Sequence, residues 1–461
     1  MANMFEKSVE AHAAALELEP DYLEALNLRA STFIILGKYD EAGADYSRVL
    51  ELDRDHIIVD AFTGIAKLLS AKEDTMPGGW SKVVDTLSTL IPAYEEKLSS
   101  LPEGSNAHVD QVKSVLLGHL KKMHLVMFAY HDHKTGDTDR AWQHLRSAYH
   151  YKMSAVAPYD SRLEQQKTDQ VSGVFRRGFW PSNSGSISKK PIFIVGFPRC
   201  GSTLLERILD AHAQIVGTGE DSIFSGMLND IRDAIVEASM TGSHQNVKNA
   251  VEKYADIVDT KTQKRWAELQ LNSDSGEADI QPQRFVDKML TNYLNIGFIH
   301  MLYPDALILH IAREPMDTVF SAYKHEFPPG SLDYTSEFES LAQMYRGYRD
   351  IMDHWDEHLP GRVTHIRYED IVHDMPGMAK AIVAAAGLDW DENVLNFHKK
   401  KHAVNTQSTT QVRKGVYKDS LQSWKRYESK LKPLIKVLGP EYTEHKFKTS
   451  LPTYQHSSWV D

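Results

Sequence analysis

Several features that often define a protein class are scarce or missing in these 461 residues. The single cysteine, Cys200, excludes a disulfide within the chain and is typical of a reducing compartment. The apolar runs, such as 191–197, are far shorter than the roughly 20 residues that span a bilayer, so we expect no membrane span. The first residues include Glu6, Glu10 and Glu17 and lack the apolar core of a secretory signal, so we expect a cytoplasmic protein.

Acidic residues outnumber basic ones, and common metal-ligand motifs are missing. The formal net charge is -11, which disfavours duplex nucleic acid as a partner. Histidines include the "HDHK" of residues 131–134, but neither H-E-x-x-H nor a Cys/His ligand set occurs, so we predict no metal. The remaining composition, 42% hydrophobic and 25% charged, is that of a globular protein, and the length predicts two or three domains.

The N-terminal part contains a repeat. "LELEPDY" begins at Leu16 and "LELDRDH" begins at Leu50, and the unit at 22–55 has small residues and Tyr46 where two antiparallel helices would meet. This unit resembles the tetratricopeptide (TPR) repeat. We therefore expect a partly degenerate, TPR-like helical domain over 1–175, with a weaker copy near 137–152. Such helices either bind a protein partner or pack against the next domain, and the small number of clear repeat units favours the second alternative.

The pattern changes after a linker rich in Gly, Ser and Pro, which we assign to 176–190. Strand-like segments that are each followed by a helical pattern predict an α/β domain over 191–445 with a parallel sheet, in which ligands bind beyond the carboxyl ends of the strands. An insertion at about 221–283 reads as largely helical and is expected to cover the acceptor side, and 446–461 form a tail. The strand segments are 191–196, 284–288, 306–312 and 362–369.

The stretch "GFPRCGSTLLE" almost forms a nucleotide-binding P-loop. Gly196 is followed after four residues by Gly201, and Ser202 stands where a P-loop has lysine. A glycine turn that opens a helix presents backbone N–H groups to an anion. Because the missing lysine is a charge that phosphoryl transfer uses, a magnesium-dependent kinase or triphosphatase is the less favoured alternative.

This stretch resembles the 5'-phosphosulfate loop of sulfotransferases, which use 3'-phosphoadenosine 5'-phosphosulfate (PAPS) as donor. "HIAREPMDTVFSAY", from 310, resembles the same family's 3'-phosphate signature. The blocks "FVDKMLTNYL" and "NTQSTTQVRKGVYKDSLQSWKRYE" are similar to TPR-containing sulfotransferases and, more distantly, to tyrosylprotein sulfotransferases. The resemblance implies a P-loop-like fold and PAPS as cofactor, with 3'-phosphoadenosine 5'-phosphate as product.

The resemblance also implies which residues bind the cofactor. Arg199 to Thr203 would hold the 5'-phosphosulfate, although Cys200 replaces the usual serine with a weaker hydrogen-bond donor. Arg313 and Ser321 would hold the 3'-phosphate, together with a C-terminal clamp, and Tyr368 would contact the adenine. The implied cofactor-binding residues are Arg199, Cys200, Gly201, Ser202, Thr203, Arg313, Ser321, Tyr368, Arg413, Lys414 and Gly415.

The implied chemistry is an in-line sulfuryl transfer to a hydroxyl or amine. Glu220 would act as general base, with Asp221 as its rival, Lys288 would stabilise the leaving group, and Ser408 would contact the transition state, although its neighbours Thr409 and Thr410 leave that register open. The expected acceptor is a small metabolite or a glycan. The alternatives are a protein-tyrosine sulfotransferase and, from another class, a TPR scaffold whose transferase domain is inactive.

Overall fold

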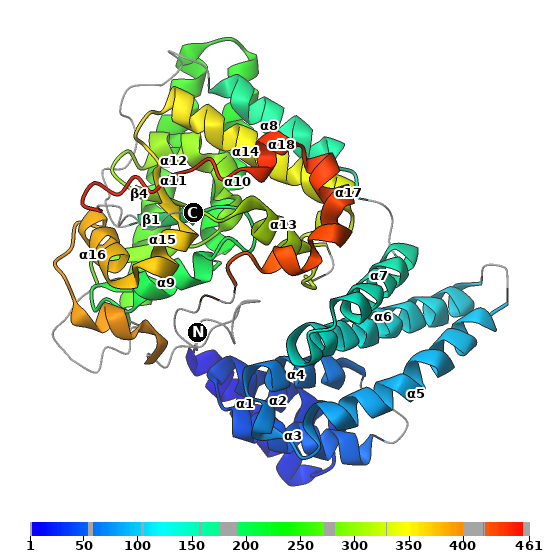
Figure 1. Cartoon of the computed structure of the whole chain (residues 1–461). Helices are drawn as coiled ribbons and strands as arrows, with labels where there is room; N and C mark the ends of the chain where they lie inside the picture. The colour runs from blue at the N-terminus through cyan, green and yellow to red at the C-terminus, as the bar shows by residue number, and fades with distance from the viewer. Residues whose placement is uncertain are drawn as a thin grey trace. The chain divides into compact units, whose positions relative to one another are not determined.

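The computed structural model describes residues 2–53, 59–102, 106–155, 159–175, 191–220, 222–271, 282–328, 330–399, 418 and 420–454. Several predicted features lie outside these residues, namely the linker 176–190, Asp221, Ser408, the clamp Arg413 to Gly415 and the end of the tail. The described chain forms two units, Met1–Tyr159 and Asp160–Lys400 with Gly415–Asp461, and each has its own hydrophobic core (Figure 1).

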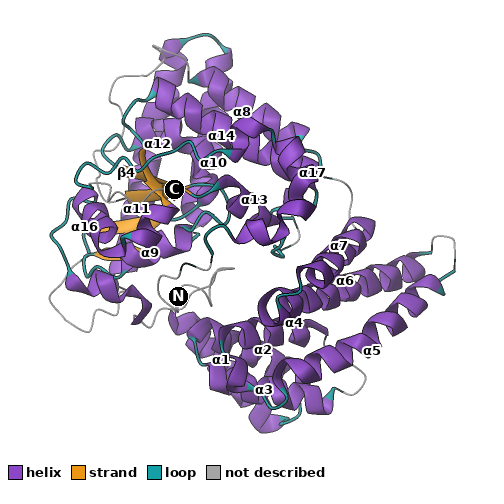
Figure 2. Cartoon of the chain, in the orientation of Figure 1, coloured by secondary structure: helices purple, strands orange, loops and turns teal. Residues whose placement is uncertain are grey.

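The first unit is helical over its described residues, as the repeat predicts (Figure 2). Its short helical turns are η1 (Glu73–Thr75) and the π-helical η2 (Tyr130–Thr135). Its α-helices are α1 (Ala2–Leu18), α2 (Leu23–Leu36), α3 (Tyr39–Leu52), α4 (Val59–Ala71), α5 (Gly79–Ser99), α6 (Ala107–Ala129) and α7 (Thr138–Ala155).

The hairpin of α2 and α3 explains the repeat pattern. Gly37 ends α2 with φ 76°, a left-handed conformation that glycine adopts without strain, and its N–H donates to the carbonyl of Ile34. Ala42 and Tyr46 of α3 are fully buried, and the Tyr46 hydroxyl lies 3.0 Å from Oγ of Ser31 on α2. The residues that the sequence placed between two helices therefore do lie there, and the TPR-like organisation is confirmed for this hairpin.

The second unit contains a five-stranded parallel sheet with the order β2-β3-β1-β4-β5. The α/β fold class and the four predicted strands are confirmed to within two residues, while the three-residue strand β2 was not predicted. The central strand β1 is buried over its whole length, which explains its uninterrupted apolar sequence. The strands are β1 (Pro191–Val195), β2 (Ile215–Gly217), β3 (Arg284–Asp287), β4 (Leu307–Ala312) and β5 (Thr364–Arg367).

Helices alternate with these strands, as parallel connections require. Those that follow strands are α9 (Ser202–Asp210), α10 (Ser222–Met240), α11 (His244–Leu271), α12 (Ile296–Leu302), α13 (Pro315–Tyr323), α14 (Phe338–His358), α15 (Tyr368–His373) and α16 (Met375–Ala385). The C-terminal helices are α17 (Glu428–Leu438) and α18 (Pro440–Thr443). The 3₁₀ segments are η3 (Leu290–Asn295), η4 (Asp333–Ser336), η5 (Glu392–Lys399) and η7 (Ser423–Tyr427).

Two observations concern the expected domain limits. The described part of the insertion consists of α10 and α11, in keeping with its helical sequence pattern. The helix α8 (Arg162–Val174), which the sequence patterns grouped with the N-terminal helices, contacts α10 and α14 and belongs to the second unit (Figure 1). None of the described helices combines the length and the hydropathy that a bilayer span requires.

Candidate functional site

The glycine loop connects β1 to α9. Gly201 is the N-cap of α9 with φ 100°, and a Cβ atom there would lie 2.3 Å from Cδ2 of Tyr368. Glycine is therefore required twice at this position, by its backbone conformation and by the aromatic ring packed against it. The first N–H groups of α9 have no acceptor within the helix, which leaves the loop suited to an anion.

The side chain of Cys200 is buried in the core beside the start of α9. It is 1% exposed and belongs to the core cluster that includes Ile194, Leu205 and Ile311. Burial raises the pKa of the thiol to about 11, with hydrogen bonds from Ser202 acting in the opposite direction. The thiol is thus neutral and buried. Cys200 stands where the resembled family usually has serine, and this position lies in the hydrophobic core.

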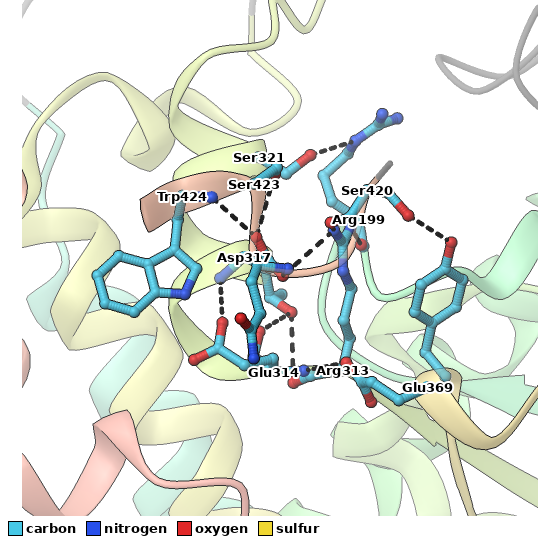
Figure 3. Close-up of polar contacts among 12 residues, drawn as sticks. Arg199, Arg313, Glu314, Asp317, Ser321, Glu369, Ser420, Ser423 and Trp424 are labelled. Carbon is cyan, nitrogen blue, oxygen red and sulfur yellow. Dashed lines mark hydrogen bonds and ion pairs between the residues drawn. The ribbon is translucent and has the colours of Figure 1, made fainter. Parts of the chain in front are cut away.

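Arg313 leaves the end of β4 and meets the C-terminal segment (Figure 3). Its Nη2 donates to the carbonyl of Ser420 at 2.5 Å, and its guanidinium lies 5.1 Å from the ring centroid of Tyr368. The Tyr368 hydroxyl in turn lies 3.0 Å from Oγ of Ser420. Two predicted cofactor residues therefore share one partner, which the sequence did not single out.

Arg199 of the loop reaches the next predicted residue. Its Nε donates to Oγ of Ser321 at 3.3 Å (Figure 3). Its Nη2 lies 3.1 Å from Nε2 of His325. The carbonyl of Arg199 accepts a hydrogen bond from Nη1 of Arg313 at 3.4 Å. The glycine loop and the first turns of α13 are thus linked by two arginines, so the two sequence signatures form one basic site.

A second cluster surrounds Lys288, which follows β3. Its side chain is 1% exposed, and its ammonium donates to Oε1 of Glu220 at 2.7 Å and lies 3.9 Å from Oε2 of Glu206 on α9. Burial disfavours the charged amine, but Glu206 and Glu220 outweigh this effect and raise the pKa of Lys288. Burial also raises the pKa of Glu206, which accepts a hydrogen bond from the N–H of Gly219 at 2.7 Å.

The sheet explains why these two clusters lie near the loop. β3 and β4 are both paired with β1 and run parallel to it, so the residues after their carboxyl ends meet at one edge. The structure brings Arg199, Arg313, Ser321 and Tyr368 into one cluster, and Glu220 with Lys288 into the other. Lys288 forms ion pairs with Glu220 and Glu206.

Three residues of the site were missed by the sequence analysis, namely Glu206, Asp317 and Ser420. Glu206 and Asp317 belong to the two motifs that were quoted, and both are buried acids, which need partners. An acid within a largely apolar motif was therefore the sequence signal that could have pointed to these two residues. Their partners are remote in sequence and follow only from the fold.

The residues present fit a nucleotide that carries two phosphate groups. Among the described residues, the buried Nε of Arg313 finds no hydrogen-bond acceptor, which leaves a cationic donor for an anion. Arg199 supplies a second guanidinium beside the N-terminus of α9. Arg313 and Ser321 would hold one phosphate, and Arg199 with the start of α9 the other.

Part of the second unit is similar to known sulfotransferases. Residues 191–392 match the profile described as "Sulfotransferase family". Sulfotransferase 4A1 of Mus musculus is 22% identical over 210 residues, which cover 44% of this chain and 61% of that protein. The sulfotransferase domain from the Synechococcus PCC 7002 olefin synthase is 19% identical, with coverage of 59% and 94% and a TM-score of 0.29.

Two further relatives differ in kind. An uncharacterized protein of Aquifex aeolicus is 29% identical over 266 residues, 55% of this chain and 33% of that protein. The mitochondrial import receptor subunit TOM34 of Rattus norvegicus is 31% identical over 101 residues, with coverage of 22% and 31%. The chain thus spans about a third of the Aquifex relative and less than two thirds of Sulfotransferase 4A1.

Proposed function

We propose that this protein transfers a sulfuryl group from 3'-phosphoadenosine 5'-phosphosulfate to a hydroxyl or amine of a small metabolite or glycan, without a metal ion. The observation that carries this proposal is the Glu220–Lys288 pair beside the glycine loop of a sulfotransferase-family region. When bound, the donor supplies the sulfuryl group. The residues of this chain bind it, accept the proton of the acceptor and offset the charge of the leaving group.

The exposure of the two acids at Lys288 supports Glu220 as the general base. The side chain of Glu220 is 57% exposed, whereas that of Glu206 is 8% exposed. An acceptor hydroxyl can therefore reach Glu220 but not Glu206, and a general base must lie within hydrogen-bond reach of the proton that it accepts. Glu206 would instead hold the buried ammonium in place.

The hydrogen bond between the pair couples proton acceptance to charge stabilisation. Protonation of Glu220 cancels its negative charge and weakens its hold on Lys288. Of the two acids, only Glu206, at 3.9 Å, would then still carry a charge beside the Lys288 ammonium. The ammonium would donate a hydrogen bond to the negative charge that develops on the leaving group. Ser408 and the clamp Arg413 to Gly415 would complete the site in this proposal.

An acceptor screen tests the proposal. The protein would be mixed with donor labelled in its sulfur and with pools of sugars, phenols, amines and tyrosine peptides, in a buffer that contains EDTA. Label transferred to a metabolite or sugar pool supports the proposal, and transfer to tyrosine peptides alone would favour the protein-tyrosine alternative. If the product nucleotide binds but no pool accepts label, the inactive scaffold is favoured instead.

A further inference from the structure

Asp317 joins the two sequence segments of the nucleotide site. It lies in the first turn of α13, and its side chain is fully buried. Its carboxylate accepts three hydrogen bonds from the C-terminal segment: from the N–H of Gln422 at 2.6 Å, from the N–H of Trp424 at 3.0 Å and from Oγ of Ser423 at 3.1 Å (Figure 3). One buried carboxylate thus binds three consecutive residues that are more than a hundred positions away in the chain.

These bonds satisfy the start of η7. Gln422, which precedes η7, has φ 55°, and the first N–H groups of a helical turn have no acceptor within it. A carboxylate at this end is favourable because it accepts these N–H groups and carries negative charge. Here the capping acid comes from α13 and not from the sequence next to η7. Asp317 therefore caps the start of η7 and also holds this C-terminal segment against α13.

The same segment orients Arg313. The carbonyl of Ser420 accepts from Nη2 of Arg313, and this nitrogen also lies 3.7 Å from Oδ2 of Asp317. These two partners lie on the Nη2 side of the guanidinium, whereas the buried Nε has no acceptor among the described residues. Nε and Nη2 lie on the same edge of the planar guanidinium, so the partners that fix Nη2 also fix the direction of the Nε–H donor.

We propose that Asp317 is a positioning residue of the nucleotide site, which holds residues 420–424 at the end of β4 and thereby aims Arg313 at the 3'-phosphate. This inference rests on the proposed function, because that function requires a nucleotide with a 3'-phosphate. The inference goes beyond the proposed function because it gives Asp317 a part in distinguishing nucleotides with a 3'-phosphate from those without one. In this inference Asp317 acts through Arg313 and does not contact the nucleotide. The anchored segment follows the predicted clamp Arg413 to Gly415 by only a few residues.

The test compares two probes, 3'-phosphoadenosine 5'-phosphate and adenosine 5'-phosphate, by titration calorimetry. Their affinity ratio measures recognition of the 3'-phosphate. In Asp317→Asn, an amide N–H₂ replaces one acceptor and faces N–H groups, so the segment is released while the size of the side chain is kept. We expect the ratio to fall about tenfold, which corresponds to the loss of one or two charge-assisted hydrogen bonds, and the affinity for adenosine 5'-phosphate to change little.

Asp374→Asn is the matched control. Asp374 caps α16 by accepting from the N–H of Gly377 at 3.0 Å, so its loss removes a carboxylate cap in the same unit. We expect the control to keep the wild-type ratio within about twofold, because a cap contributes to stability at its own helix end. Equal loss of affinity for both nucleotides in Asp317→Asn would show a purely structural role and overturn the inference.

A second variant covers the case in which Asp317→Asn does not fold, as judged by circular dichroism. Ser423→Ala removes one of the three hydrogen bonds and keeps the carboxylate, and we expect the ratio to fall about two- to threefold. An unchanged ratio in the folded variants overturns the inference even if the wild-type protein strongly prefers the 3'-phosphate. A wild-type protein that binds neither nucleotide contradicts the proposed function itself, and the role of Asp317 with it.

Discussion

Nζ of Lys288 donates a hydrogen bond to Oε1 of Glu220 at 2.7 Å, although only the lysine is buried. The pair links a fixed cation inside the protein to a carboxylate that solvent and an acceptor can reach. We expect Glu220→Ala and Lys288→Ala to lower turnover of labelled donor by about 10²–10⁴-fold, as the loss of an acid–base group does, while binding of the product nucleotide stays nearly intact.

The matched control for the first variant is Glu237→Ala, which removes an exposed carboxylate of α10. It should keep wild-type turnover. Removal of Lys288 takes away the ammonium that lies 3.9 Å from the buried Glu206, so the folded state of Lys288→Ala must be checked by circular dichroism before its activity is compared. Full activity in either folded variant would show that its assigned role is wrong.

Gly201 offers a test of the loop. Because a Cβ atom would meet the ring of Tyr368 at 2.3 Å, and because φ is 100°, we expect Gly201→Ala to lower the free energy of unfolding by at least about 2 kcal/mol and to weaken nucleotide binding. Urea unfolding and calorimetry measure the two effects.

Gly347→Ala is its control. Gly347 lies inside α14 and a Cβ atom there meets nothing within 4 Å, so we expect a gain in stability of about 0.5–1 kcal/mol and unchanged binding. Equal behaviour of the two variants would contradict the packing of Tyr368 against the loop.

Cys200 should be unreactive in the folded protein. Burial raises the pKa of its thiol to about 11, so at pH 8 only about one molecule in a thousand carries the reactive thiolate. We expect 5,5'-dithiobis(2-nitrobenzoate) to label the thiol in guanidinium chloride but not in native buffer. Rapid labelling of the native protein would mean that the thiol faces solvent, and would reopen its role as a contact for the cofactor.

Glu314 gives the site a pH-dependent contribution to stability. Burial, the largest cause, raises the pKa of this N-cap acid from 4.5 to about 7, with the charges of Asp317 and Glu369 acting in the same direction. Between these two values the folded protein binds more protons than the unfolded chain, so this contribution to stability falls as the pH rises. Relative to Glu314→Gln, the wild-type free energy of unfolding should fall by at most about 3 kcal/mol between pH 5 and 8.

Urea unfolding at several pH values measures this difference. Glu339→Gln, at an exposed acid of α14, is the control and should give a difference that does not change with pH. A wild-type advantage over Glu314→Gln that rises with pH would contradict the burial of a neutral Glu314.

The sequence predicted the parts of this protein that depend on local patterns. Four strands, the helical insertion and the glycine loop follow from short apolar runs and spacing, whereas β2 was missed because three residues carry too little pattern. The pairing of Arg199 with Ser321 and of Lys288 with Glu206 could not be predicted, because both depend on which strands are neighbours. Asp317 was part of a quoted motif, but its partners at 422–424 became visible only in the fold.

The central claim is that the glycine loop and Arg313 bind a 3'-phosphorylated adenosine nucleotide without magnesium. Titration calorimetry of the full chain with 3'-phosphoadenosine 5'-phosphate in EDTA tests it most directly. The account predicts binding with a Kd in the micromolar range or below, about −8 kcal/mol or more favourable, which magnesium leaves unchanged. Absence of binding, or binding of ATP that depends on magnesium, would contradict it.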